Sequence, residues 1–162
     1  MYVKLVVKHE DGTKLLAGED VAPVNLFLQS LFSQIDVSIQ DKLLSTTSGY
    51  YPYKAYIQIL LKYGLNSKNL QLSTQLWMKE TTYLFDDVDF TNGDNTNGIV
   101  RMAYIKESKV LDLQCPILHD LFQVKRYILN QVGISIKFYR SRPDFCLLSN
   151  EAKKYKIDID QC

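Results

Sequence analysis

The chain has 162 residues, of which 46% are hydrophobic and 23% charged, and its formal net charge at pH 7 is +1. This length and apolar content suit one globular domain, residues 1–162, and argue against a disordered chain. A net charge so close to zero gives the molecule no overall attraction to nucleic acid or acidic membranes, so we expect no specific nucleic-acid partner.

The three cysteines, Cys115, Cys146 and Cys162, lie far apart and form no Cys-x-x-Cys pair. This spacing argues against a disulfide framework and a thiolate zinc site. Cys115 and Cys146 lie in apolar runs, which is typical of small buried hydrophobes rather than catalytic thiols. No apolar run is long enough for a signal peptide or a membrane span, and Asn-x-Ser/Thr does not occur. We therefore expect an intracellular chain that is not secreted and does not span a membrane.

The first third of the chain predicts strands and one short helix. Residues 2–9 alternate between apolar and polar side chains, which indicates a half-buried strand. Residues 24–32 are apolar at helical spacing and predict a short helix or turn. Residues 35–39 alternate again, and the polar tip at 40–42 predicts a hairpin.

A longer helix is expected after the Ser/Thr/Gly loop at 45–51. Pro52 suits the first turn of a helix, where its missing N–H has no partner to lose. Apolar residues then recur on one helical face as far as Leu61, and Gly64 is expected to end the helix in the left-handed conformation. Asn66 or Ser67 is expected to cap a second helix.

The segment Asp86–Gly98 is rich in side-chain oxygens, which raises the possibility of a calcium site. An EF-hand loop needs glycine at its sixth position and glutamate at its twelfth. Counted from Asp87, these positions hold Asn92 and Gly98, so the pattern fails. We interpret the segment as a flexible, exposed loop and expect no bound metal.

The second half again predicts mainly strands. Residues 99–105, 110–113, 134–139, 145–148 and 155–159 are expected to be strands, and Pro116 is expected to start a helix that runs to Leu129. About eight short strands without a strand–helix–strand repeat disfavour a parallel sheet. The expected fold class is mainly β: an antiparallel jelly-roll sandwich of about eight strands with two or three helices in the long connections.

No catalytic or cofactor-binding pattern stands out. His119 and Asp120 are neighbours in sequence, so on a helix they would not share a face as an acid–base pair must. The sequence has no Gly-x-Ser-x-Gly elbow and no glycine-rich phosphate loop. Trp77 and the tyrosines around Tyr51 offer stacking surfaces, but no basic stripe accompanies them. We therefore predict a protein that is not an enzyme and that carries no cofactor.

Three segments in the first half suggest a family: VAPVN at 21–25, LFSQIDV at 31–37 and YPYKAYI at 51–57. LWMKET at 76–81, DLF at 120–122, RYILN at 126–130, ISIKF at 134–138 and FCLL at 145–148 follow in colinear order. Together these segments resemble the N-terminal jelly roll of the double jelly-roll major capsid (hexon-like) proteins of Polinton (Maverick) elements and adintoviruses. The residues that carry this resemblance are Pro23, Asn25, Leu31, Phe32, Asp36, Tyr51, Pro52, Tyr53, Tyr56, Asp120, Leu121, Phe122, Arg126 and Phe145.

The resemblance implies a structural role in a virion capsid, in which the chain associates into trimers or capsomers and contacts other capsid proteins. The family has two fused jelly rolls, whereas this length allows one. A fragment of a major capsid protein, a single-jelly-roll minor or penton protein, and a host-retained copy that binds a partner or interferes with viral assembly are all compatible with that difference. An enzyme or sugar-binding module on the same sandwich is a further alternative, because one fold hosts many functions.

Overall fold

The computed structural model describes residues 1–46, 48–80, 83–90, 93–150 and 153–162. The framework is mainly β, with 29% strand in three antiparallel sheets, and 31% of the residues lie in short helices between the strands. In the first sheet the central strand β1 (Tyr2–His9) pairs with β5 (Leu111–Gln114) and with β8 (Tyr155–Gln161). The pairing of Lys4 with Gln161 brings the two ends of the chain together.

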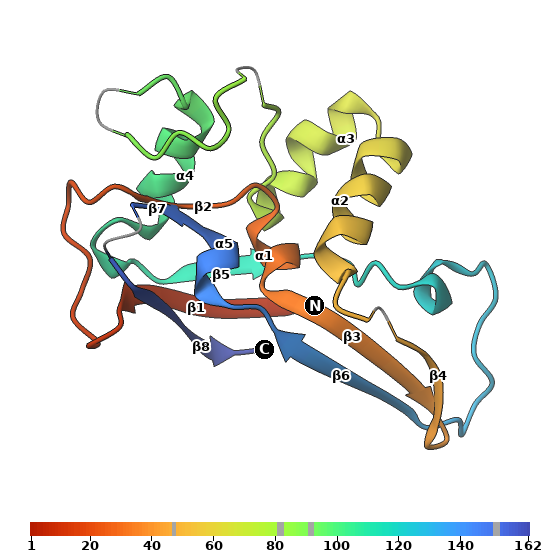
Figure 1. Cartoon of the computed structure of the whole chain (residues 1–162). Coiled ribbons are helices and arrows are strands. Elements are labelled where there is room, and N and C mark those ends of the chain that lie inside the picture. Colours follow the sequence, from red (N-terminus) through yellow and green to blue (C-terminus); the bar gives the residue numbers. More distant parts are fainter. Residues whose placement is uncertain (47, 81–82, 91–92, 151–152) are drawn as a thin grey trace.

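The second sheet has the order β4–β3–β6 and extends away from the body (Figure 1). Its strands are β3 (Phe32–Ile39), β4 (Lys42–Thr46) and β6 (Ile134–Arg140). The hairpin between β3 and β4 turns at Gln40 and Asp41, which both have positive φ, as the predicted polar tip requires. The strands expected at 2–9, 35–39, 134–139 and 155–159, and the hairpin, are therefore confirmed.

A third pair joins β2 (Val21–Pro23) to β7 (Leu147–Ser149). The helices are α1 (Phe27–Ser30), α2 (Tyr51–Lys62), α3 (Leu65–Leu70), α4 (Thr96–Ile105) and α5 (Pro143–Cys146). Single 3₁₀ turns are η1 (Leu72–Gln75), η2 (Lys106–Ser108) and η3 (Asp120–Gln123). The helices and the β2–β7 pair lie over one side of the two larger sheets (Figure 1).

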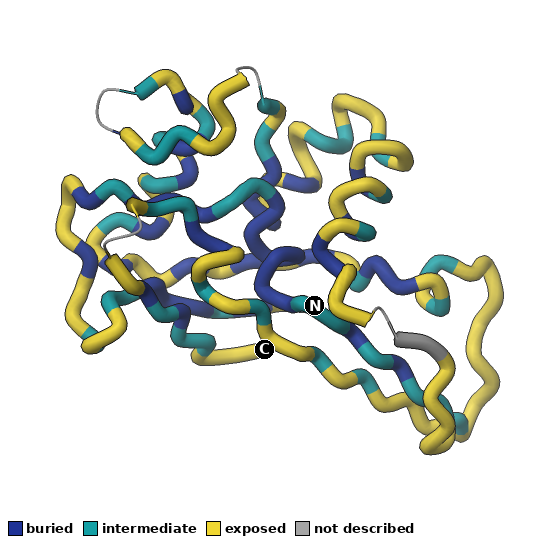
Figure 2. The backbone as a smooth tube through the Cα atoms, viewed as in Figure 1, coloured by how far each residue is buried: buried dark blue, intermediate teal, exposed yellow. Residues whose placement is uncertain are grey.

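The core lies between this helical layer and the sheets, where the buried segments of Figure 2 converge. Val3, Leu5 and Val7 of β1 are fully buried, as the period of two predicted. Ala55 and Ile59 of α2 pack into the same core. Because Pro52 lies in the first turn, the expected start of α2 is confirmed.

The strand expected at 99–105 is wrong, because these residues form most of helix α4. The side chain of Asn95 accepts a hydrogen bond from the Gly98 N–H and so caps the first turn. The buried residues of α4 are Gly98, Arg101 and Ile105, which follow helical spacing. A charged residue on the buried face hid this period from a hydropathy pattern.

The helix expected from Pro116 to Leu129 is also wrong, since only the 3₁₀ turn η3 forms within it. Two long-range contacts hold the backbone that precedes this turn. The Cys115 N–H donates to the carbonyl of Met1, and the Leu118 N–H donates to the Tyr51 hydroxyl. These long-range bonds fix the path of residues 115–118, which lead into η3 without helical structure.

Four smaller expectations need correction. Gly64 has a φ of −68° and precedes α3 as its N-cap, so it is not a left-handed cap of α2, and the caps expected at Asn66 or Ser67 lie inside α3. The strand expected at 145–148 is divided between α5 and β7. The loop 86–98 is not wholly exposed, because Phe90 and Asn95 are buried, while residues 91–92 lie outside the described part.

Candidate functional site

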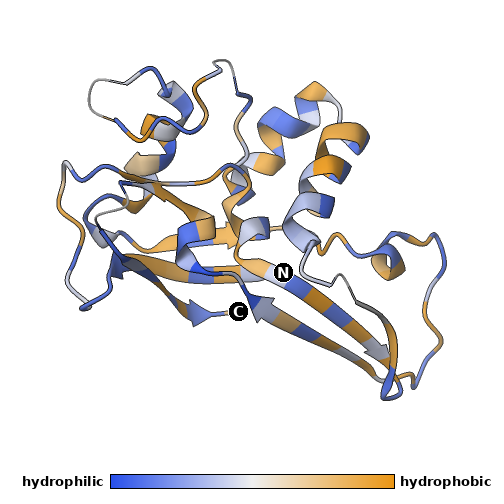
Figure 3. Cartoon of the chain, in the orientation of Figure 1, coloured by the Kyte–Doolittle hydropathy of each residue, from blue (hydrophilic) through white to orange (hydrophobic). Residues whose placement is uncertain are grey.

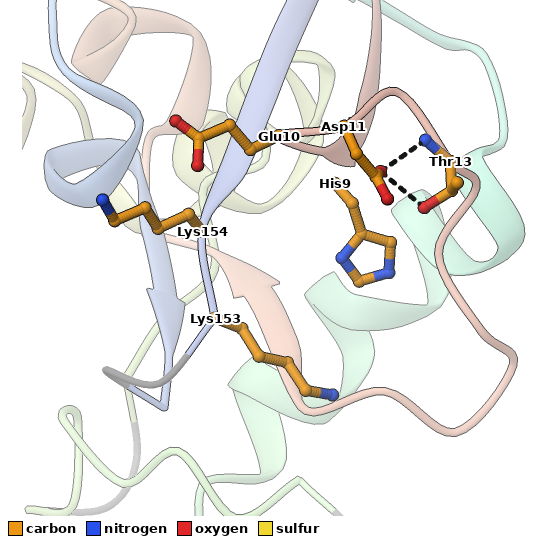
Figure 4. A pocket seen from close by; sticks show the side chains of 6 residues that line it. All are labelled: His9, Glu10, Asp11, Thr13, Lys153 and Lys154. Carbon is orange, nitrogen blue, oxygen red and sulfur yellow. Dashed lines mark hydrogen bonds between the residues drawn. The ribbon is translucent and has the colours of Figure 1, made fainter.

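A wide-open depression of about 770 Å³ lies at the end of β1, lined by His9, Glu10, Asp11, Thr13, Lys153 and Lys154. Figure 4 shows the His9 ring between the turn at Asp11 and the Lys153 side chain. The Asp11 carboxylate accepts hydrogen bonds from the N–H and hydroxyl of Thr13, which hold the turn. These bonds lower the pKa of Asp11.

The buried carboxylate of Glu19 contacts two residues that line this depression, His9 and Lys153. Its Oε2 lies 3.0 Å from His9 Nε2 and accepts the Leu16 N–H at 3.1 Å. Its Oε1 accepts hydrogen bonds from Lys153 Nζ and the Tyr155 hydroxyl, both at 3.1 Å. The His9 ring stacks on Tyr155 with centroids 5.5 Å apart. One buried acid thus joins β1, the loop before β2 and β8.

The protonation of this cluster follows from its contacts. Burial raises the pKa of Glu19, but the hydrogen bonds from Leu16, Lys153 and Tyr155, with the field of His9, outweigh it and lower the pKa overall. Burial and the bond to Glu19 raise the pKa of the Tyr155 hydroxyl. At neutral pH Glu19 is therefore a charged carboxylate that accepts hydrogen bonds from several donors. These bonds fix the end of β1 and the start of β8.

A second polar cluster joins α4 to the segment that follows η1. Arg101 donates from Nη1 to Glu80 Oε1 at 3.0 Å and from Nε to the Pro23 carbonyl at 2.8 Å. Glu80 also accepts from the amides of Asn25 and Asn97. The Asn25 side chain donates to the Met78 carbonyl and accepts the Met78 N–H, as a paired strand would. Asn25 therefore fastens the 76–80 segment beside α1.

A third cluster is buried beneath the start of α2. The Tyr51 hydroxyl donates to Gln29 Oε1 at 2.5 Å, and the Gln29 amide donates to Gln75 Oε1 and to the Pro116 carbonyl. Burial strongly raises the pKa of Tyr51 and raises that of Cys115 nearby to about 12. The cluster links α1, α2 and η1 through neutral groups.

A groove runs between α2 and the segments 24–30, 77–80 and 85–86, and we name it the α2 groove. Its largest hollow has a volume of about 480 Å³. Two adjoining hollows of about 300 and 240 Å³ share Asn25 and Tyr56 with it. The largest hollow is lined by Val24, Asn25, Leu26, Gln29, Ser30, Pro52, Tyr53, Tyr56, Ile57, Asp86 and Phe145. The rings of Tyr53 and Phe145 meet edge to face, with centroids 5.9 Å apart.

The structure brings together about half of the residues that carried the family resemblance. Asn25, Pro52, Tyr53, Tyr56 and Phe145 line the α2 groove. Pro23 and Tyr51 are buried and hydrogen-bond to the lining residues Arg101 and Gln29, respectively. Leu31 and Phe32 are buried in the core where α1 leads into β3.

The other residues that carried the resemblance lie elsewhere. Asp120 pairs with Lys54 at 2.8 Å, on a different side of α2 from the groove. Leu121 and Phe122 continue η3, Asp36 lies within β3, and Arg126 is exposed beyond η3. Thr81, the last residue of the 76–81 motif, lies outside the described residues.

His119 was considered above as a possible acid–base residue, but its ring has a structural role. Its Nδ1 accepts the Leu121 N–H at 3.2 Å and caps η3. Burial, reinforced by the nearby Lys54, lowers its pKa, so the ring is neutral at pH 7.

Sequence reasoning missed the residues that organise the two charged clusters, Glu19 and Arg101. Glu19 lies in an irregular loop, and its partners are far away along the chain, so no local pattern marks it. Arg101 had one usable signal. It lies three residues after Gly98 and four before Ile105, which is helical spacing.

The helices within the described ranges are too short or too polar to cross a bilayer. In the same part of the chain, His, Cys, Asp and Glu side chains do not gather in groups of three or more that could hold a metal ion. Comparison with protein-family models, curated proteins and solved structures finds no match.

Proposed function

We propose that this chain is a structural capsid protein: the jelly roll of a major capsid protein from a Polinton- or adintovirus-like double-stranded DNA virus, or from its integrated copy. In this proposal the sheets that contain β1 and β3 are the two sheets of the jelly roll. The chain associates into trimers or capsomers inside the cell and resides in the virion shell.

One observation carries the proposal: the apolar surface along α2 is uncovered. Tyr53, Ile57, Leu60 and Leu61 are all exposed on this helix, and Leu65 and Leu70 extend the surface on α3. Figure 3 shows these hydrophobic segments on the outer helices. A contiguous exposed apolar patch of a few hundred Å² usually marks a protein interface. Residues of the family resemblance lie on this same surface, which supports an assembly role.

The clusters around Glu19 and Glu80 support the same proposal. Each joins segments that are distant in sequence, and each satisfies its buried charge with several donors. Hydrogen-bonded clusters of this kind hold the protein surface in one shape. The assembly of many identical copies requires such a fixed surface.

The test is the oligomeric state of the purified full chain, measured by light scattering on a sizing column over a concentration series. We expect concentration-dependent trimers or hexamers, or shell-sized particles that electron microscopy would show. A chain that stays monomeric over the whole series would contradict the proposal.

A further inference from the structure

Some of the charged residues that line the α2 groove make no ion pair with the described residues. Asp86 lines the two hollows at one end and makes no ion pair with the described residues. Lys68 and Lys79 line the hollow at the other end, beside Trp77. Glu80 and Arg101 also line these hollows, but they pair with each other. Among the described residues, the charges left without an ion pair are therefore an acid at one end of a largely apolar groove and two bases at the other.

A second unusual feature is the segment 124–130, whose sequence is VKRYILN. It forms neither helix nor strand, and every residue in it is exposed, as the continuous yellow run after η3 in Figure 2 shows. Tyr127 is 103% exposed and Leu129 is 82% exposed. Large apolar side chains in one exposed run are costly to leave in water and mark a binding segment.

The segment and the groove are complementary. Lys125 and Arg126 make no ion pair with the described residues, and both precede the apolar residues 127–129. If Lys125 and Arg126 of a bound segment lie beside Asp86, the apolar side chains of residues 127–129 reach the hollows lined by Tyr56 and Trp77. The reverse direction would place Lys125 and Arg126 against Lys68 and Lys79, so charge also selects the orientation.

The segment of one molecule leaves α2 on the side away from its own groove. The turn η3 is attached to α2 through Lys54, Gln58 and Lys62. The groove is lined by Tyr53, Tyr56, Ile57 and Leu60 of the same helix. At 100° per residue, these two sets point about 150° apart around the helix axis. A 124–130 segment that binds in the groove would therefore come from another copy.

We propose that residues 124–130 of one copy bind in the α2 groove of a second copy, with Lys125 and Arg126 at Asp86 and Tyr127 in the apolar hollow. Such a contact joins two different surfaces, so it closes rings or extends filaments. A seven-residue segment provides only part of a standard interface of about 1,600 Å², so ring closure is expected to strengthen it. This inference rests on the proposed function and specifies the surface that it uses.

The direct test uses a fluorescent peptide of residues 122–132 and the full chain carrying Tyr127→Ser and Leu129→Ser, whose own segment is disabled. We expect saturable binding in fluorescence anisotropy that weakens as salt rises. Asp86→Lys in the receptor should weaken binding at least about tenfold. A peptide with Lys125→Glu and Arg126→Glu should restore it. Asp160→Lys, the same charge change on β8, is the matched control and should have no effect.

In the peptide titration, either of two results would overturn the inference: no saturable binding, or binding that Asp86→Lys leaves unchanged. In the full chain, Tyr127→Ser with Leu129→Ser should raise the concentration needed for self-association at least about tenfold. If the unsubstituted chain associates and these substitutions change nothing, the proposed function stands and this inference fails. If the unsubstituted chain never associates, the proposed function fails, and the peptide titration separately decides whether the groove binds the segment.

Discussion

Arg101 of α4 and Glu80 form a buried ion pair, with Arg101 Nη1 3.0 Å from Glu80 Oε1. The arginine is only 1% exposed and also donates to the Pro23 carbonyl, so it ties α4 to β2 as well. Its removal leaves a largely buried carboxylate without its cation. A charge in that position is costly, because the surrounding protein cannot replace the lost solvation.

We therefore expect Arg101→Met to lower the free energy of unfolding in urea by about 3–5 kcal/mol. Adding Glu80→Gln should recover part of this loss, since the stranded charge is then gone. The control is Lys54→Met, which breaks the Lys54–Asp120 pair on the surface and should cost no more than about 1 kcal/mol. Equal losses for Arg101→Met and Lys54→Met would contradict the structural role given to Arg101.

A glycine pair tests the packing at the start of α4. A Cβ on Gly98 would lie 2.5 Å from Phe90 Cε1, whereas a Cβ on Gly133 would meet no atom within 4 Å. Gly98→Ala should lower the free energy of unfolding by about 1–3 kcal/mol through overpacking. Gly133→Ala should change it by less than about 0.5 kcal/mol. A neutral or stabilising Gly98→Ala in thermal or urea unfolding would show that α4 packs differently against the loop.

The Glu19 cluster predicts an acid-sensitive contribution to stability. Because the folded-state pKa of Glu19 is lowered, its contribution is complete above its ordinary value of 4.5 and is lost as pH falls through the folded-state value. At pH 7, Glu19→Gln should cost about 2 kcal/mol, since hydrogen bonds to a charged group are lost. The difference from the unsubstituted chain should shrink as pH falls below the ordinary value of 4.5, measured by urea unfolding at each pH. A difference that does not vary with pH would argue against a charged Glu19.

The cysteines should differ in reactivity. Burial raises the pKa of Cys115 to about 12 and that of Cys146 to about 11, whereas Cys162 is exposed. Because the thiolate is the reactive form, a thiol reagent at pH 8 should label one cysteine rapidly in the native chain and all three in urea. Cys162→Ser should abolish the rapid phase. Rapid labelling of Cys115 or Cys146 in that variant would contradict the packing of the core.

The candidate site was only partly foreseeable. Tyr53 and Tyr56 were identified by their place in a family motif, but nothing local indicated that Phe145 would lie against Tyr53. In the sequence, Asp86 is one of several acidic and polar residues in a loop, and nothing distinguishes it from them. The structure places it on the rim of the α2 groove. Such relationships depend on where distant segments meet, which one sequence does not state.

The sequence by itself determined the elements whose local pattern agrees with their environment. Alternation in β1, β3, β6 and β8 and the first-turn proline of α2 are such cases, because burial on one face imposes a period that can be read directly. Only the tertiary structure decided α4 and the segment after Cys115. In α4 the buried face contains Arg101, which is stable there only because Glu80 lies opposite. After Cys115, bonds to Met1 and Tyr51 fix a non-helical path for residues 115–118, and only the short turn η3 follows. In both cases a partner far away in the chain outweighs local propensity, because a buried charge or backbone group must be satisfied wherever its partner lies.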